Sequence, residues 1–351
     1  MDFSFSSDQL LFQDNVRSFL LNEVTPERLR ELWHSDSGRC DALWEQLVAL
    51  GLSAITVPEA DGGMGMNELD FILIAQECGY AGLPEPLVET MLVGVPLLAG
   101  LDPEHASLKQ HWLARVAEGT ARLAVAEPGN PLVSDAHVAD LLLLAHGDAL
   151  HAVERSAVSL TRNASVDPSR QLFQVQWNAS AATCVATGEQ ARQLWASAFN
   201  CGALGNAAQL LGLAKRMVDL AVDYTFERKQ FGKPVGSFQA VKHLMANVAV
   251  LIEFAKGPLY RAAYAVAHDL PGQAVHVSHA KLACAEAAAL AAKNAIQVHG
   301  AMGYTWEVDL HLFMKRAWAL DKLWGDRGLH KARVRAALFD NRLAIGAGST
   351  F

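Results

Sequence analysis

The sequence predicts a mainly α-helical protein with a small β domain between two helical regions. Apolar residues recur with helical spacing from Asp8 to about residue 119, and again from Glu189 to about residue 341. Between these regions, short apolar segments alternate with turn-forming residues. We therefore expect three domains: an N-terminal helical domain at 1–120, a small β domain at 121–186 and a C-terminal helical bundle at 187–351.

In the first region, two amphipathic faces and a capping residue predict helices. Each face is a set of apolar residues on one side of a helix: Leu10, Leu11, Val16, Phe19 and Leu20 in the first, and Ala42, Leu43, Leu47 and Leu50 in the second. Residues 51–58 predict a short extended link, and the glycines within 61–65 predict a turn. Asn67 is a favoured N-cap for a helix over 68–78.

The middle region contains short apolar segments, which are typical of strands. They cover residues 139–145, 149–153 and 172–177, and the last of them alternates apolar with polar side chains. Asparagine, aspartate, glycine and proline separate the segments. This pattern predicts a small β domain.

The third region predicts long helices that pack closely. One apolar helix face runs from Leu204 to Tyr224. Gly232 and the proline and glycine that follow it interrupt this pattern, which resumes at Phe238. The alanine-rich segment 280–296 lets helices approach one another, as in a bundle.

The bulk composition excludes several classes of protein. A chain of 351 residues with 51% hydrophobic and 19% charged residues fits a globular protein, and its net charge of −8 argues against nucleic-acid binding. No apolar run reaches the ~20 residues that a membrane-spanning helix needs. The first residues lack the features of a secretion signal, and the five cysteines are dispersed without a CxxC pair. We expect a cytoplasmic protein with reduced thiols and no metal site.

The segment between the two long helices carries the most specific motif. It reads Tyr-Thr-Phe-Glu-Arg-Lys-Gln-Phe-Gly-Lys-Pro-Val-Gly-Ser-Phe-Gln over residues 224–239. The string closely resembles the Arg-x-x-Phe-Gly…Phe-Gln segment of the acyl-CoA dehydrogenases, flavoproteins that oxidise acyl-CoA thioesters to enoyl-CoA. The order of helices, small β domain and helical bundle is also that of this family. The resemblance implies an acyl-CoA dehydrogenase-like fold with a shortened β domain and a C-terminal four-helix bundle.

The resemblance also implies FAD as cofactor, and it assigns roles to residues of two motifs. By this resemblance, Arg228, Gln230 and Phe231 would lie against the flavin of a neighbouring subunit. Arg228 would meet its pyrophosphate, Phe231 would pack by its adenine, and Gln239 would hydrogen-bond the cofactor. Alone, Arg228 also fits an ordinary solvated cation at a helix end. An electron-transfer flavoprotein would be the electron acceptor.

The second motif is Gln-Val-His-Gly-Ala-Met-Gly-Tyr at 297–304, which resembles the family's Gln-x-x-Gly-Gly-x-Gly-Tyr turn. In the family this turn contacts the adenosine half of the flavin. Its implied cofactor contacts are Gln297, His299, Gly300 and Ala301, where Ala301 replaces the second glycine of the family motif. The same residues also fit a helix C-cap turn.

The motifs that act on a chain's own flavin are incomplete. Of the family's Thr-Glu-Pro-Gly-x-Gly-Ser-Asp segment, Glu127-Pro-Gly129 is present, whereas the Gly-Ser that follows is missing. The family's second flavin-binding strand, of Trp-x-Thr/Ser type, has no visible counterpart. The β domain is also shorter than the family's.

The catalytic base is missing from both positions where the family carries it. Removal of the α-proton needs a carboxylate, and the usual Glu near the C-terminus corresponds to Trp324. The other family position, on the helix before the arginine motif, corresponds to Gly202. Asp326 is a candidate substitute base, although an N-cap role is favoured. Glu307 and His311 have the spacing of a metal-ligand pair, but a surface pair is favoured.

Three functions are consistent with these observations. The first is a subunit of a heteromeric acyl-CoA dehydrogenase that completes the FAD site of a paralogous, base-carrying partner. The second is a self-sufficient homo-oligomeric acyl-CoA dehydrogenase that uses Asp326 as its base. The third is a non-catalytic assembly protein of the same fold. The acyl-CoA substrate is not identified by the sequence, because fold analogy does not settle chemistry.

Overall fold

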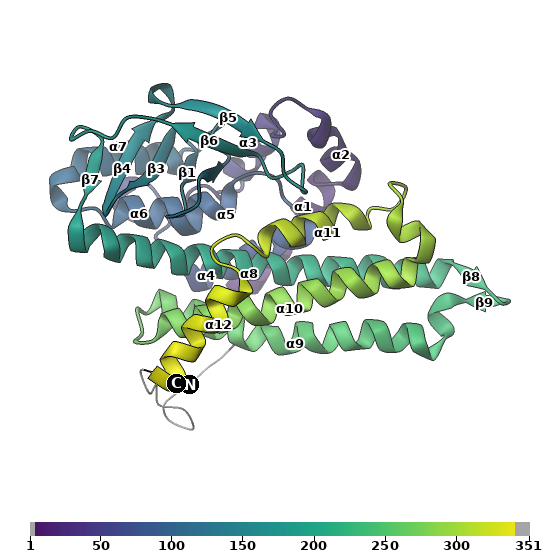
Figure 1. Cartoon of the computed structure of the whole chain (residues 1–351). Helices are drawn as coiled ribbons and strands as arrows, with labels where there is room; N and C mark the ends of the chain where they lie inside the picture. Colours follow the sequence, from purple (N-terminus) through teal and green to yellow (C-terminus); the bar gives the residue numbers. More distant parts are fainter. Residues whose placement is uncertain (1–3, 341–351) are drawn as a thin grey trace.

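The computed structural model describes residues 4–340 and shows two helical parts with a small β part against one side (Figure 1). The predicted mainly helical fold with a small β region is therefore confirmed. No helix within residues 4–340 is long and apolar enough to cross a membrane. The predicted domains also include residues 1–3 and 341–351, which lie outside the described residues.

The N-terminal part is a set of helices that pack on one another and on the long helices behind them. Their bounds are α1 Ser7–Glu23, α2 Pro26–His34, α3 Asp41–Ala49, α4 Glu68–Ala81, α5 Leu87–Glu89, α6 Val95–Ala99 and α7 Ala106–Ala117. Between α5 and α6 the backbone continues as a π-helical turn, η2, over Thr90–Gly94. Asn67 caps α4 through a capping box with Asp70, so the predicted cap is confirmed.

Two details of this part differ from the prediction. Leu10 and Leu11 are 45% and 61% exposed, whereas Val16 and Leu20 on the same helix are buried. At about 100° per residue, Leu11 lies on the opposite side of α1 from Leu20, so one helix face cannot bury both. Residues 51–58 form turns and bends rather than the predicted extended link.

The β part contains two small sheets. The four-stranded sheet has the order β1-β3-β4-β7 and the three-stranded sheet has the order β2-β6-β5. The strand bounds are β1 Leu123–Val125, β2 Leu132–Ser134, β3 Leu141–His146, β4 Ala149–Glu154, β5 Ser159–Asn163, β6 Leu172–Gln176 and β7 Cys184–Ala186. The strands predicted at 139–145, 149–153 and 172–177 are confirmed as β3, β4 and β6.

Strand β3 joins two apolar cores because its side chains alternate between the faces of the sheet. Leu141 and Leu143 belong to the main core, which also contains residues of both helical parts. Leu142 and Leu144 belong to a smaller core between the two sheets. The main core is thus continuous across the predicted limits at 120 and 186, and the division into three domains stays a prediction.

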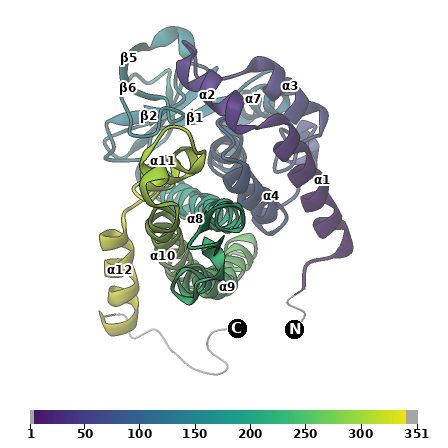
Figure 2. The ribbon, with the colours of Figure 1, turned by 90° about the vertical axis from the view of Figure 1, so that its right-hand side faces the viewer.

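Three long helices form the C-terminal bundle: α8 Gly188–Glu227, α9 Gln239–Ala267 and α10 Gln273–His299. Figure 2 looks along them and shows α4 beside α8 and α12 on the outer side of α10. The shorter helices are α11 Leu310–Leu320 and α12 Arg327–Arg335, and a two-stranded hairpin of β8 Lys229–Gln230 and β9 Lys233–Pro234 lies between α8 and α9. The buried alanines of α10 form much of its contact with α8 and α9, as predicted.

Candidate functional site

The first predicted motif forms the tip of the bundle. After α8 ends at Glu227, the chain turns through the β8–β9 hairpin and enters α9 at Gln239 (Figure 1). The amide of Val235 donates a 2.8 Å hydrogen bond to the carbonyl of Arg228, which closes the hairpin. The predicted interruption between the two helices is therefore confirmed.

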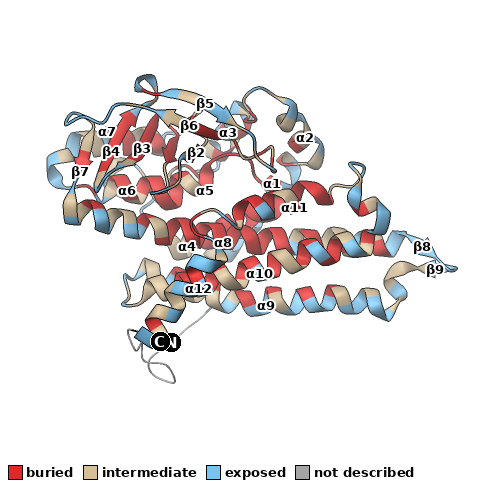
Figure 3. Ribbon diagram, in the orientation of Figure 1, coloured by how far each residue is buried: buried red, intermediate tan, exposed pale blue. Residues whose placement is uncertain are grey.

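The hairpin at this tip consists largely of exposed residues (Figure 3). Arg228, Gln230 and Gln239 are exposed, and the ring of Phe231 is 90% exposed. Burial of a phenylalanine ring stabilises a structure by about 1.5–3 kcal/mol, so such exposure marks a surface suited to a contact. A guanidinium beside an exposed ring and two amides matches the needs of a nucleotide that carries phosphates.

The second predicted motif lies directly beside the first. The ring of Tyr224, near the end of α8, stacks on the ring of His299 with centroids 4.3 Å apart. The Tyr224 hydroxyl also donates a 3.4 Å hydrogen bond to the carbonyl of His299. These contacts join the ends of α8 and α10, so the two motifs share one end of the molecule.

The end of α10 and the turn after it expose three of the four predicted cofactor contacts of the second motif. Gln297, Gly300 and Ala301 are exposed, whereas His299 is buried and its Nδ1 lies 2.7 Å from the carbonyl oxygen of Ala295. Burial lowers the pKa of His299, which favours the neutral ring. His299 thus connects α10 to α8. Gly300 has a φ of 60° with ψ of −136°, a conformation that favours glycine, and the space where a Cβ would lie is open.

The two positions where the family carries its base meet in the interior. Trp324 is fully buried, and its indole ring lies against the backbone of Gly202. A Cβ at residue 202 would come within 2.4 Å of the Cδ2 and Cε2 atoms of Trp324. Trp324 has a φ of 54°, a left-handed conformation that surrounding contacts must hold in a bulky residue. Neither position offers a carboxylate.

A carboxyl group that the sequence reasoning missed lies beside this pair. The indole Nε1 of Trp324 donates a 3.2 Å hydrogen bond to Oε2 of Glu89, the last residue of α5. Burial raises the pKa of Glu89 to about 7, and the bond from Trp324 opposes the shift. The signal in the sequence was a single acidic residue within the apolar stretch 87–98. The π-turn that follows Glu89 is also a feature common near functional sites.

The segment that carries Trp324 is tied to the bundle by two buried polar side chains. The ammonium of Lys281 donates hydrogen bonds of 2.9 and 3.0 Å to the carbonyls of Leu320 and Leu323. Nε2 of His330 lies 2.9 Å from the carbonyl oxygen of Trp324. Burial lowers the pKa of Lys281 to about 7 and that of His330 to about 4. A neutral His330 with its proton on Nε2 donates to that carbonyl.

The remnant of the family's own-flavin segment is in contact with the same loop. The backbone amide of Trp324 donates a 3.4 Å hydrogen bond to Oε2 of Glu127, and Arg170 donates one of 3.4 Å to the carbonyl of Ala319. These contacts bring the β part against residues 319–324. For FAD, the exposed tip therefore fits as part of a shared site. The chain's own side does not fit as a complete flavin site, because Glu127-Pro-Gly129 is all that remains of the family's own-flavin segment.

Asp326 has the role of a helix cap. Its side chain accepts a 2.9 Å hydrogen bond from the amide of Leu329 at the start of α12, and the favoured N-cap interpretation is confirmed. This backbone bond lowers the pKa of the exposed Asp326 carboxyl. A general base at neutral pH benefits from a raised pKa, so the geometry does not favour Asp326 as the base.

The favoured interpretation of Glu307 and His311 as a surface pair is wrong. Glu307 is exposed and precedes α11, whereas His311 is buried, with its ring centroid 4.6 Å from that of Trp306 and 5.5 Å from that of Trp33. Aromatic packing around the ring makes His311 a core residue. Across residues 4–340, no group of three or more His, Cys, Asp or Glu side chains is placed to hold a metal ion.

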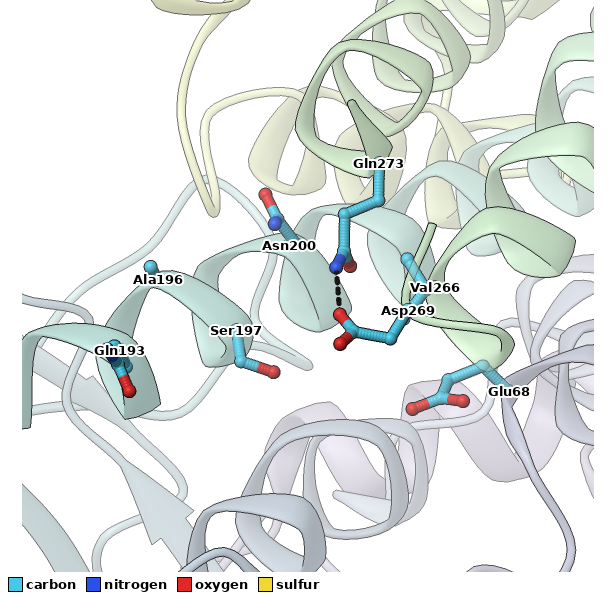
Figure 4. A pocket seen from close by; sticks show the side chains of 8 residues that line it. All are labelled: Glu68, Gln193, Ala196, Ser197, Asn200, Val266, Asp269 and Gln273. Atoms are coloured by element: carbon cyan, nitrogen blue, oxygen red, sulfur yellow. Dashed lines mark hydrogen bonds between the residues drawn. The ribbon is translucent and has the colours of Figure 1, made fainter. Parts of the chain in front are cut away.

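A polar surface pocket of about 440 Å³ lies elsewhere, between the start of α8, the α9–α10 turn and the start of α4 (Figure 4). Its lining residues are Glu68, Gln193, Ala196, Ser197, Asn200, Val266, Asp269 and Gln273. By helical geometry, Ser197 and Asn200 face away from the side of α8 that carries Gly202. The pocket is thus separate from the Trp324 centre.

Comparison with known proteins places the chain among flavoproteins. Models of the N-terminal and C-terminal domains of acyl-CoA dehydrogenases match residues 6–120 and 193–339. The chain is 33% identical to the acyl-CoA dehydrogenase IpdE2 of Mycobacterium tuberculosis over 312 residues, which are 88% of this chain and 91% of that protein. It is 29% identical to IpdE2 of Mycolicibacterium smegmatis over 337 residues, 95% of this chain and 100% of that protein.

A solved structure shows the same fold. The match is a chain of the ChsE4–ChsE5 complex of Mycobacterium tuberculosis, with a TM-score of 0.85, 24% identity, and coverage of 97% of this chain and 99% of that one. The sequence matches extend through both helical parts, and the cofactor of the matched family is FAD. Because both domain models match and the identity to IpdE2 extends over most of its length, this chain belongs to the acyl-CoA dehydrogenase family.

Proposed function

We propose that this chain is a subunit of a heteromeric acyl-CoA dehydrogenase and completes the FAD site of a paralogous, base-carrying partner. The observation that carries the proposal is a contrast between the exposed tip of the bundle and the interior of the same molecule. The tip around Arg228 is exposed and rich in polar and aromatic groups. In the interior, by contrast, the indole of Trp324 lies against the backbone of Gly202, and neither of these two family base positions carries a carboxylate.

In this proposal the tip binds and orients the cofactor of the partner. FAD held there would supply the acceptor for the hydride that leaves the β-carbon of the acyl thioester. Arg228 donates charged hydrogen bonds to the pyrophosphate, and Phe231 covers the adenine, which also buries its exposed ring. Gln239 and Gln297 donate or accept hydrogen bonds at the edge of the cofactor. The contact excludes water from one side of the nucleotide.

The partner supplies the proton-abstracting carboxylate. This chain has Trp324 and Gly202 at the two family positions, and the exposed Asp326 is occupied as a cap with a lowered pKa. Glu89 is half-buried beside Trp324, and its carboxyl group is occupied as the acceptor of the indole N–H. These observations favour a partner-dependent enzyme over the self-sufficient dehydrogenase. The intact exposed tip favours it over a non-catalytic assembly protein.

The relatives of this chain support the proposal. A chain of the ChsE4–ChsE5 complex has this fold, and the IpdE2 relatives are named acyl-CoA dehydrogenases. The proposal also includes a cytoplasmic location and an electron-transfer flavoprotein as the acceptor of the electrons. An acyl-CoA thioester is the substrate class.

The proposal is tested by turnover of an acyl-CoA with an artificial electron acceptor. The chain is assayed alone and together with a paralogous acyl-CoA dehydrogenase chain that carries the glutamate. We expect activity only for the mixture, and loss of that activity when the partner's glutamate is replaced by glutamine. Turnover by the lone chain would contradict the proposal and would favour the self-sufficient alternative.

A further inference from the structure

The fully buried indole of Trp324 lies between Gly202 of α8 and Glu89, the residue before the π-turn η2. The cavity that remains beside it measures about 10 Å³. This volume is about the least that one water molecule requires. Residues of α8, among them Gly202 and Gly205, form one wall, and Val88, Leu92 and Val93 form the other. Removal of the indole would therefore open a slot with apolar side chains on one wall and with Glu89, Asn206 and Gln209 as polar groups in its lining.

The ends of this slot have different chemistry. Glu89 closes one end and accepts the indole N–H, so it supplies the only polar contact that the Trp324 ring makes among the hydrogen bonds within residues 4–340. At the other end, the backbone of Trp324 contacts Glu127 and His330. The slot thus begins at the position of the missing base and runs inward along α8 to a carboxyl group.

From this geometry we propose that Trp324 is a built-in occupant of the chain's own acyl pocket. Its indole takes the place of the acyl group of a CoA thioester, and Glu89 holds the indole there by hydrogen bonding. This inference rests on the proposed acyl-CoA chemistry, and it adds the reason why the chain binds no substrate at its own centre. The chain excludes substrate by filling the pocket as well as by lacking a base.

The occupant is held firmly because contacts restrain both its ring and its backbone. The ring packs on Gly202 and lies edge-on to Phe199, with centroids 6.2 Å apart. Lys281 and His330 bind carbonyls of the segment that ends at Trp324. A side chain with this many buried partners does not leave its place without breaking several hydrogen bonds. The closed pocket is therefore the resting state of the chain.

The test replaces Trp324 by glycine in the full chain and measures the binding of two probes. Octanoyl-CoA tests the acyl pocket, and indole tests whether a cavity has formed. Trp44→Gly is the matched control, because Trp44 is also buried and its indole donates a 2.9 Å hydrogen bond to the carbonyl of Gly119. We expect Trp324→Gly to bind octanoyl-CoA at least tenfold more tightly than the wild type and Trp44→Gly do, with binding of free CoA unchanged.

Two results would overturn the inference. One is a folded Trp324→Gly chain that binds octanoyl-CoA no more tightly than the wild type. The other is binding of indole without tighter binding of octanoyl-CoA, because the space would then be a sealed cavity instead of an acyl pocket. If the glycine variant does not fold, Trp324→Leu with Trp44→Leu as its control provides the same comparison with a smaller opening.

These results are independent of the partner experiment. Binding to the lone chain needs no flavin and no second subunit, so tighter octanoyl-CoA binding can be observed even if the mixture with a paralogue shows no turnover. That combination would contradict the proposed function while supporting the acyl pocket. Turnover of the mixture together with an unchanged affinity in Trp324→Gly would contradict the pocket alone.

Discussion

The indole ring of Trp324 rests on the backbone of Gly202, although the two residues belong to different segments of the chain. These are the two positions at which the family resemblance predicts a catalytic glutamate. Their contact shows that both positions face the same small volume. In this chain the volume is filled by an aromatic ring, and the residue opposite has no side chain to compete with it.

The contact predicts that Gly202→Ala destabilises the protein. The new methyl group would lie 2.4 Å from the indole, so the ring or the helix must shift. We expect a loss of about 1–3 kcal/mol in the free energy of unfolding, measured by urea denaturation. In a Trp324→Ala background the clash is absent, and the same change should cost little or should stabilise α8. Equal losses in both backgrounds would refute the contact.

Glu89 predicts a pH-dependent stability. Burial raises its pKa to about 7, with Asp135 and Glu127 adding to the shift and Trp324 and Arg170 opposing it. The folded state then binds a proton more tightly than the unfolded state, whose glutamate has a pKa near ~4.3. The contribution of Glu89 to stability is fully present below the unfolded pKa of ~4.3. It is lost as the pH rises through the folded pKa of about 7.

Replacement of Glu89 by glutamine removes this titration while keeping an acceptor for the indole. We therefore expect Glu89→Gln to gain stability relative to the wild type as the pH rises from about 4 to 7. Thermal unfolding of both proteins at several pH values measures this difference. A difference between the two proteins that does not change over this range would show that Glu89 ionises normally in the fold.

Lys281 predicts a loss of stability when its ammonium is removed. It is fully buried on α10, and Lys281→Met would remove the hydrogen bond to the carbonyl of Leu323 and leave the carbonyl of Leu320 with only the amide of Leu323. We expect a loss of about 1–3 kcal/mol in the free energy of unfolding. Lys293→Met is the control, because Lys293 is exposed on the same helix. Equal stability of the two variants would contradict the anchoring role.

The lowered pKa of Lys281 sets the pH dependence of this effect. Its folded value is about 7, below the ~10.4 of an unfolded lysine, so the folded state releases its proton first. The contribution of the side chain is complete above the unfolded value and is lost as the pH falls through about 7. The penalty of Lys281→Met should therefore grow as the pH rises from 7 toward 10.

The N-cap role of Asp326 predicts that its replacement affects the stability of the protein and not catalysis. Asparagine caps helices as well as aspartate does, so Asp326→Asn should unfold with nearly the wild-type free energy, whereas Asp326→Ala should lose about 1 kcal/mol. In the complex with a base-carrying partner, both variants should turn over acyl-CoA at the wild-type rate. Abolished turnover in Asp326→Asn would instead identify Asp326 as the base.

The sequence was sufficient to predict features that depend on residue type and on spacing along one segment. The cap at Asn67, three of the strands and the interruption after α8 follow from residue type and spacing, and the structure confirms them. The exposed flavin motifs were also visible, because a short string of residues carries them. Exposure of Leu11 could have been anticipated from the helical angle alone.

The interior of the site could not be read in this way. The contact between Trp324 and Gly202 and the bond from Trp324 to Glu89 join residues from three separate segments. Periodicity describes one helix at a time and does not say which faces meet. The same limit explains His311, whose surroundings come from α2 and from the loop before α11.

The central claim is that this chain contributes Arg228 to the flavin of a partner. The most direct measurement is the flavin content of the purified complex, compared among the wild type, Arg228→Ala and Arg192→Ala. Arg192 is the control because it is exposed at the opposite end of the same helix. We predict flavin in the wild-type and Arg192→Ala complexes, at least tenfold weaker flavin binding in Arg228→Ala, and little flavin in the lone chain. Stoichiometric flavin in the lone chain, or full retention in Arg228→Ala, would contradict the claim.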